Sequence, residues 1–268
     1  MSVALATIAG VLAGAHTSTW GMYKDAVHEG FTVPKYLRSM LISGMIAPAL
    51  VLLAGMPAAG IGNLIVLFGV TYVMERALVE FWKTFLREED QSKYFIPMQF
   101  AVRGRVVHNR RTRLIAGACV AAVAILLVAL VIGLQSFAMP ASGAPLPWWI
   151  FLLAGSIGGW FSAVGGAWKD APHEGFETFK FFRSPVLAAL FALLASQFSE
   201  QVLWTSMAGL GFTIATLETY KTFCFPNKPR GKFAGKPVLY PVMLHRRNWF
   251  VPLYVIIWLL LLAGFIAG

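Results

Sequence analysis

The segment that decides the fold occurs twice, as KDAVHEGFTVPKYLRS at 24–39 and as KDAPHEGFETFKFFRS at 169–184. The two copies align without a gap and share 10 of 16 residues. We call KDAVHEGF at 24–31 the first motif and KDAPHEGF at 169–176 the second motif. The likeness continues from 78–85 to 216–223, so it indicates a duplication of nearly the whole chain, with repeats at 1–138 and 148–268.

The chain around these motifs is strongly apolar, with 58% apolar and 13% charged residues among 268. Soluble domains have roughly 45–50% and about 25%. Stretches approaching the roughly 20 residues that cross a bilayer lie at 2–23, 40–58, 61–82, 114–137, 148–168, 185–204, 206–224 and 249–267. The sequence therefore predicts an all-α integral membrane protein of about eight transmembrane helices, built as two tandem four-helix repeats.

Basic residues are confined to one set of loops. Except for Arg76, every Lys and Arg lies within 24–39, 83–113, 169–184 or 221–248. By the positive-inside rule these segments are cytoplasmic, which leaves both termini on the non-cytoplasmic side, and we expect a bacterial inner membrane. Because each repeat has an even number of spans, the repeats are predicted to be parallel, with a pseudo-twofold axis along the membrane normal. The net charge of +10 then reflects topology, and nucleic acid is not an expected partner.

The residues that both motifs retain are candidate ligands. D-x-x-H-E on a helix places its i, i+3 and i+4 side chains on one face, and a glutamate near a span end could join each set. The candidate metal set is Asp25, His28, Glu29, Asp170, His173, Glu174, Glu80 and Glu218. Carboxylate and imidazole ligands suit iron, manganese or zinc. The alternative is structural: Asp25 and Asp170 cap short cytoplasmic helices that Gly30 and Gly175 end or bend, and Glu29 pairs with Lys35 or Arg38.

Ionisable residues near the ends of two spans point to a function, because charge inside a membrane is costly. Glu80 and Glu218 each precede a lysine by three residues, Lys83 and Lys221, so ion pairs are the plain alternative. Arg76 is expected to pair with Glu80 at i+4. Glu75 and Arg76 have Thr213 and Ile214 at the equivalent positions. His16 is expected to hydrogen-bond a neighbouring helix.

A basic set is also retained in both halves. It comprises Lys35, Arg38, Lys83, Lys180, Arg183 and Lys221, together with His108 and His245. These residues suit an anionic headgroup or a phosphate at the cytoplasmic leaflet, although ordinary positive-inside topology explains them too.

Three functions fit these patterns. The first is a transporter or flippase that moves an anionic or lipid-linked substrate or a cation, with substrate or protons handled by the glutamates and the basic set. The second is a metal-dependent membrane enzyme that acts on a lipid or quinone. The third is a structural subunit of a membrane complex. Membrane lipids are expected partners in each case, and a homo-oligomer is compatible with all three.

Overall fold

The computed structural model describes residues 2–139, 144–226 and 231–268. The predicted link 138–147 therefore lies partly outside the described residues. The long helices are α1 (Ser2–Glu29), α2 (Val33–Leu53), α3 (Ile61–Phe81), α4 (Arg110–Ala138), α5 (Trp148–Glu174), α6 (Thr178–Ala195), α7 (Val202–Phe223) and α9 (Val251–Ala267). The short elements are the π-helical turn η1 (Trp82–Leu86), η2 (Gly231–Phe233), α8 (Met243–Arg246), η3 (Arg247–Phe250) and the antiparallel pair β1 (Ala101–Val102) and β2 (Arg105–Val106).

Apart from that one strand pair, all regular secondary structure of the described residues is helical, as predicted. Six helices are long and apolar enough to cross a membrane: α1, α2, α4, α5, α6 and the segment Met243–Ala267 that ends in α9. The other two long helices, α3 and α7, carry Glu75, Arg76, Glu80 and Glu218. The prediction of a helical membrane protein is confirmed at this level, and the count of eight spans stays a prediction.

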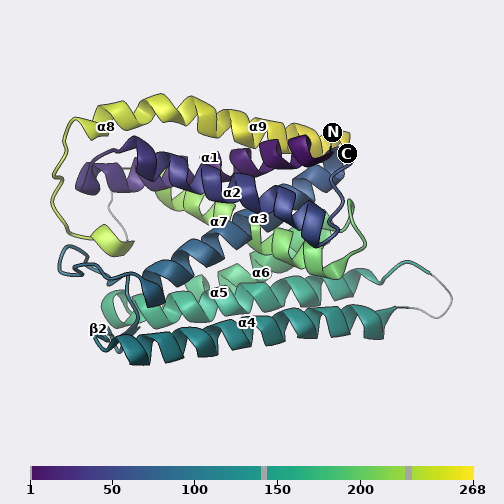
Figure 1. Cartoon of the computed structure of the whole chain (residues 1–268), viewed down its shortest axis with the longest axis horizontal. Helices are drawn as coiled ribbons and strands as arrows, with labels where there is room; N and C mark the ends of the chain where they lie inside the picture. The colour runs from purple at the N-terminus through teal and green to yellow at the C-terminus, as the bar shows by residue number, and fades with distance from the viewer. Residues whose placement is uncertain (1, 140–143, 227–230) are drawn as a thin grey trace.

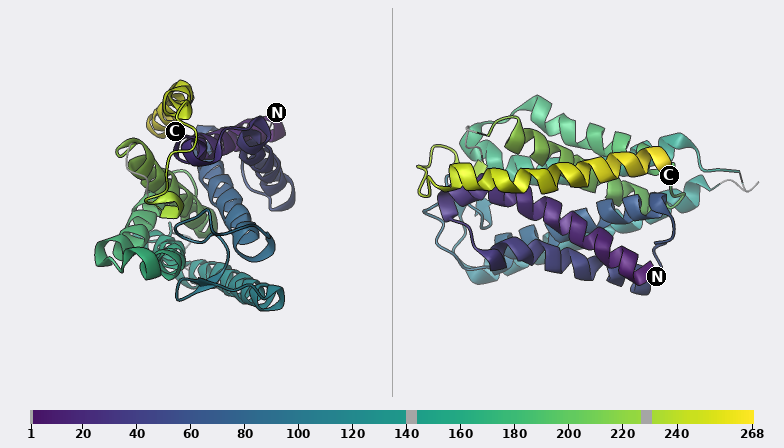
Figure 2. Two further views of the ribbon diagram at one scale, coloured as in Figure 1. Left: turned by 90° about the vertical axis from the view of Figure 1, so that its left-hand side faces the viewer. Right: turned by 90° about the horizontal axis from the view of Figure 1, so that it is seen from above.

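The helices run alongside one another in an elongated bundle whose two termini lie at the same end (Figure 1). The motifs, β2 and α8 lie at the other end, which we call the basic end because the four basic segments gather there. Helices α3 and α7 pack on each other. Helix α4 packs on α5 and α7, and α9 packs on α1 and α3. Figure 2 shows α9 beside α1 and the α4–α5 pair on the far side of the bundle.

Glycines let three helix pairs approach closely. A side chain at Gly10 or Gly14 of α1 would overlap the backbone of α2 at Ser43 or Ser39, and Gly155 and Gly159 of α5 meet α6 in the same way. In the middle of the bundle, a side chain at Gly211 of α7 would overlap the carbonyl of Gly69 in α3. Close backbone contact through small residues is the usual basis of helix packing in membranes.

One structural expectation at the motifs is wrong. Asp25 and Asp170 do not cap short separate helices: both lie inside the last turns of long helices that continue to Glu29 and Glu174. Gly30 and Gly175, with φ angles of 73° and 82°, end the two helices, as the sequence indicated. Helix α5 continues through Pro172, which has no backbone N–H to donate.

The expectation for His16 is confirmed. Its ring is fully buried, and Nδ1 lies 3.2 Å from the Tyr72 hydroxyl on α3. Trp20 of α1 donates to the same hydroxyl oxygen at 2.8 Å, and Tyr254 of α9 stacks on the His16 ring at 4.2 Å. Three helices therefore meet at one polar cluster inside the bundle.

Candidate functional site

A pocket of about 480 Å³ opens at the basic end, between the first motif and two loops. One loop follows α3, and the other contains η2 and continues to Leu239. The basic residues that line the pocket are Lys35, Arg38, Lys83, Arg87, Lys93, Lys232 and Lys236. The acidic residues that line it are Asp25, Glu29 and Glu89. With seven basic and three acidic side chains, its lining carries a positive excess.

The first motif forms one wall because α1 extends through it. Asp25, His28 and Glu29 all line the pocket, as expected for i, i+3 and i+4 positions of one helix face. Gly30 then ends the helix, and α2 begins at Val33. The short turn places the first residues of α2, and with them the basic side chains of that helix, beside the motif.

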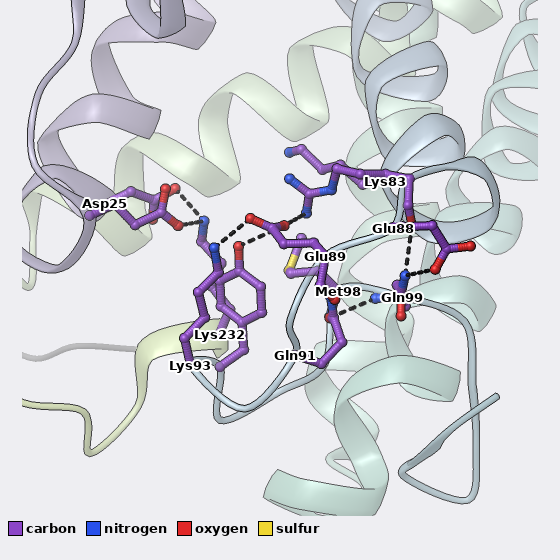
Figure 3. Close-up of polar contacts among 12 residues, drawn as sticks. Asp25, Lys83, Glu88, Glu89, Gln91, Lys93, Met98, Gln99 and Lys232 are labelled. Atoms are coloured by element: carbon purple, nitrogen blue, oxygen red, sulfur yellow. Dashed lines mark hydrogen bonds and ion pairs between the residues drawn. The ribbon is translucent and has the colours of Figure 1, made fainter. Parts of the chain in front are cut away.

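Lys232 from the second half of the chain holds the two carboxylates of the first motif. Its Nζ lies 2.9 Å from Asp25 Oδ2 and 2.9 Å from Glu29 Oε1. Figure 3 shows the contact between Lys232 and Asp25. The ammonium group also lies over the Tyr94 ring, 5.3 Å from its centroid. Glu29 makes a further ion pair with Lys35. These contacts join residues that are about 200 positions apart in the sequence.

His28 has a structural role in this wall. Only 6% of the residue is exposed, its ring stacks on Phe233 at 4.5 Å, and Nδ1–H donates to the Pro237 carbonyl oxygen at 2.9 Å. The next residues of this loop, Leu239 and Tyr240, donate backbone N–H groups to the Val27 carbonyl oxygen. The end of α1 is therefore the surface on which the loop around η2 is fixed.

The opposite wall comes from η1 and the loop after it. Lys83 donates to Glu80 Oε1 at 3.0 Å, and Arg76 pairs with the same carboxylate, as expected. Burial lowers the pKa of Lys83 to about 8, against the opposing attraction of Glu80. Further into the loop, Glu89 pairs with Arg87 and Lys93. Figure 3 shows Lys83 and Glu89 on this side of the site.

Some polar groups of the pocket wall are left unpaired. Among the residues that the structure describes, the Nε atoms of Arg38 and Arg87 and the Asp25 Oδ1 atom are buried without a hydrogen-bond partner. Within the residues that the structure describes, Arg38 makes no ion pair within 4.0 Å. Buried donors are normally satisfied. Here the Arg87 guanidinium pairs with Glu89 through Nη2, while its Nε, like that of Arg38, is left as an unused donor.

The second motif lies outside this pocket. The loop after α3 covers part of it: Trp168 Nε1 donates to the Ala101 carbonyl oxygen at 2.8 Å, and the Phe95 ring lies edge-on to His173 at 5.8 Å. Glu174 lies 3.7 Å from Lys180, while Asp170 has no ion pair within 4.0 Å among the described residues. Lys180, Arg183 and Lys221 do not line the pocket either.

The remaining predicted residues are dispersed. Glu218 lies 3.2 Å from Lys221, the expected i, i+3 pair, and 3.6 Å from Lys24 at the end of α1. His108 and His245 are exposed and do not line the pocket. Across residues 2–139, 144–226 and 231–268, no three His, Cys, Asp or Glu side chains gather closely enough to hold a metal ion. The eight predicted metal ligands are therefore not brought together.

Several pocket residues were missed by sequence reasoning. Lys232 and Lys236 lie in a basic segment whose charge was attributed to topology alone, and Tyr94 and Phe233 carry no motif. The sequence points to them only indirectly. The basic segment 221–248 can reach the first motif only if the two halves of the chain pack together at the basic end. No family model matches the chain, and no curated protein or solved structure matches it.

Proposed function

We propose that this chain is a membrane transporter or flippase for an anionic substrate, and that the pocket at the basic end is its cytoplasmic binding site. The observation that carries the proposal is the lining of the pocket, with seven basic and three acidic side chains around about 480 Å³. Positive-inside topology requires basic residues at this membrane face, but it does not require them to face one cavity.

The chemistry of the pocket favours a phosphate or sulfate group. Guanidinium groups bind such oxyanions bidentately through parallel N–H donors, and ammonium groups add point charges. Arg38 and Arg87 each have a free Nε, and Lys83 supplies an ammonium group beside them. A lipid phosphate and a free phosphate share this chemistry, so the experiment below compares the two sources.

The proposed membrane arrangement is eight spans in two parallel four-helix repeats, related by a pseudo-twofold axis along the membrane normal. Three observations support it: the glycine pairs of α1 and α5 occupy equivalent positions, α4 and α9 each pack on the other half, and the termini lie opposite the basic end (Figure 1). The basic end then faces the cytoplasm and the termini face outward, in a bacterial inner membrane.

In this proposal, substrate binding is linked to movement through the ion pairs of Lys232. Asp25 and Glu29 belong to the first half and Lys232 to the second, so these pairs tie the halves together at the basic end. An anion that binds Lys232 competes with both carboxylates and weakens the tie. The halves can then move apart here and expose the pathway between them, as alternating access requires.

The test is transport by the full-length protein in proteoliposomes, with sulfate, inorganic phosphate and fluorescent phosphatidylglycerol as probes. The variants Arg38→Gln and Lys83→Gln remove pocket charges, and Arg183→Gln and Lys221→Gln remove the equivalent charges outside the pocket. Loss of a charge-assisted hydrogen bond weakens binding by about 1.5–3 kcal/mol. We therefore expect roughly tenfold or greater loss of affinity for the transported probe in the pocket variants, and little change in the controls.

Movement of phosphatidylglycerol alone assigns a flippase, and movement of free phosphate or sulfate assigns a soluble substrate. The proposal is wrong if none of the probes is moved or bound, or if pocket and control variants lose affinity equally.

A further inference from the structure

Glu75 is a buried carboxyl group that the pocket does not use. It lies within the last two turns of α3, with 0% of the residue exposed. Neither of its carboxylate oxygens has a hydrogen-bond partner in the described part of the chain. A carboxyl group buried without hydrogen-bond partners is very unfavourable in apolar surroundings. An ionisable residue inside a membrane indicates a functional site.

The guanidinium group next to Glu75 in the sequence makes its ion pair with a different residue. Arg76 follows Glu75 in the sequence, but its guanidinium pairs with Glu80 one turn along α3 and lies 5.2 Å from the centroid of the Trp20 ring. Glu75 is therefore not simply one half of a structural ion pair, as Glu80 and Glu218 are.

Another polar atom close to Glu75 along α3 is also unpaired. The Thr71 hydroxyl is buried and has no hydrogen-bond partner among the described residues. Thr71 lies one turn from Glu75 on the same face of α3. Hydroxyls can donate to or accept from a carboxyl group in either protonation state.

A series of polar and aromatic contacts begins at Tyr72, which precedes Glu75 on α3, and runs toward the pocket. The Tyr72 hydroxyl joins His16 and Trp20, and the Trp20 ring lies near Arg76. Arg76 pairs with Glu80, which pairs in turn with the pocket residue Lys83. The second half lacks this series, because Thr213 and Ile214 stand at the positions of Glu75 and Arg76.

We propose that Glu75 is a proton-binding site inside the bundle, and that its protonation is coupled to anion movement through the pocket. The first statement stands alone, whereas the coupling rests on the proposed transport function. Protonation transfers one proton to a carboxylate oxygen, and its release restores the anion. The titratable or charged groups on the helices packed around Glu75 are His16 of α1, Tyr254 of α9, and Tyr72, Arg76 and Glu80 of α3, with Lys24 and Glu218 nearer the basic end.

The proton site can be tested without any transported substrate. We would record infrared difference spectra of the full-length protein in lipid nanodiscs between about pH 5 and about pH 9. We expect the carbonyl-stretch band of a protonated carboxyl, shifted in heavy water. The band should be absent in Glu75→Gln and Glu75→Thr, displaced in Glu75→Asp and unchanged in Glu200→Gln, which alters an exposed carboxyl. Size exclusion confirms that each variant is folded.

The coupling has a separate readout. Uptake of the transported probe into proteoliposomes should change at least severalfold with an imposed pH gradient in the wild type. Glu75→Gln should abolish that response but still bind sulfate. A band that survives in Glu75→Gln, or a wild type without any band that depends on this residue, overturns the proton site. Transport that ignores the pH gradient overturns the coupling. A Glu75 band in a protein that moves no probe leaves the proton site standing and rejects the transport function instead.

Discussion

The two motifs have nearly the same sequence and different surroundings. In the first motif, His28 is 6% exposed and lies under the loop around η2, and both carboxylates pair with Lys232. In the second motif, the equivalent His173 is half-buried. Among the described residues, the one ion pair of its carboxylates within 4.0 Å joins Glu174 to Lys180. The residues of a motif therefore do not determine alone whether it lines a pocket. The loop that packs over the motif also determines whether a pocket forms beside it.

The largest difference is expected between Lys232→Ala and Lys180→Ala. Removing Lys232 leaves Asp25 without its ion-pair partner in a largely buried wall, which should lower the free energy of unfolding by about 3 kcal/mol. Lys180 is more exposed, so its loss should change that free energy by less than about 1 kcal/mol. Thermal unfolding of the purified protein measures both. Equal shifts would show that the two motifs are equally supported.

A smaller difference is expected between His28→Ala and His173→Ala. The first change removes a ring stack and a buried hydrogen bond, together worth about 2 kcal/mol. The loop at 231–239 should then open and exchange its amide hydrogens roughly thirtyfold faster. His173→Ala removes one edge contact with Phe95 and should leave exchange at 95–104 nearly unchanged. Hydrogen exchange read by mass spectrometry compares the two loops, and similar acceleration in both would contradict the comparison.

The pH dependence of anion binding gives a further test of the difference between the two motifs, because Lys83 lines the pocket beside the first motif. Burial lowers the pKa of Lys83 from 10.5 to about 8, so its ammonium charge is present below about pH 8 and lost above it. Sulfate keeps its charge in this range, and its affinity should fall up to about tenfold between about pH 7 and about pH 9. Lys83→Arg should remove most of this dependence, because arginine stays protonated. A wild-type affinity that is constant over this range would show that Lys83 does not contact the anion.

The smallest effect is expected where the halves differ in sequence. Glu75→Thr copies the residue of the second half, Thr213, whose hydroxyl donates to the Gly209 carbonyl oxygen at 2.8 Å. The new hydroxyl can bond to the Thr71 carbonyl in the same way, so stability should rise by about 1 kcal/mol as the unpaired carboxyl disappears. The reverse change, Thr213→Glu, should destabilise the protein. A loss of stability in Glu75→Thr would show that the carboxyl has a structural partner.

Much of the local structure could be predicted from the sequence. Apolar stretches predicted the helical class, and Gly30 and Gly175 marked the helix ends, because glycine readily adopts a positive φ. The i+3 and i+4 spacings predicted the pairs of Glu80 with Lys83 and Arg76. These successes concern neighbours within one helix, where spacing alone determines contact.

The pocket could not be predicted, because its decisive contacts join distant segments. Lys232 reaches Asp25 across about 200 residues, and its loop has no periodic pattern that would place it. The predicted capping role of Asp25 was wrong because no residue before Gly30 interrupts α1. A shared motif suggested equivalent sites, whereas the covering loops differ in sequence and bring different side chains.

The contact of Lys232 with α1 also has a consequence for the order of biosynthesis. Helix α1, which carries Asp25 and Glu29, is synthesised before α7, and Lys232 follows only after α7 has been made. The pocket can therefore be completed only after the segment that follows α7 has been synthesised and has packed against the end of α1. Nascent chains arrested before residue 232 should be inserted in the membrane but unable to retain sulfate.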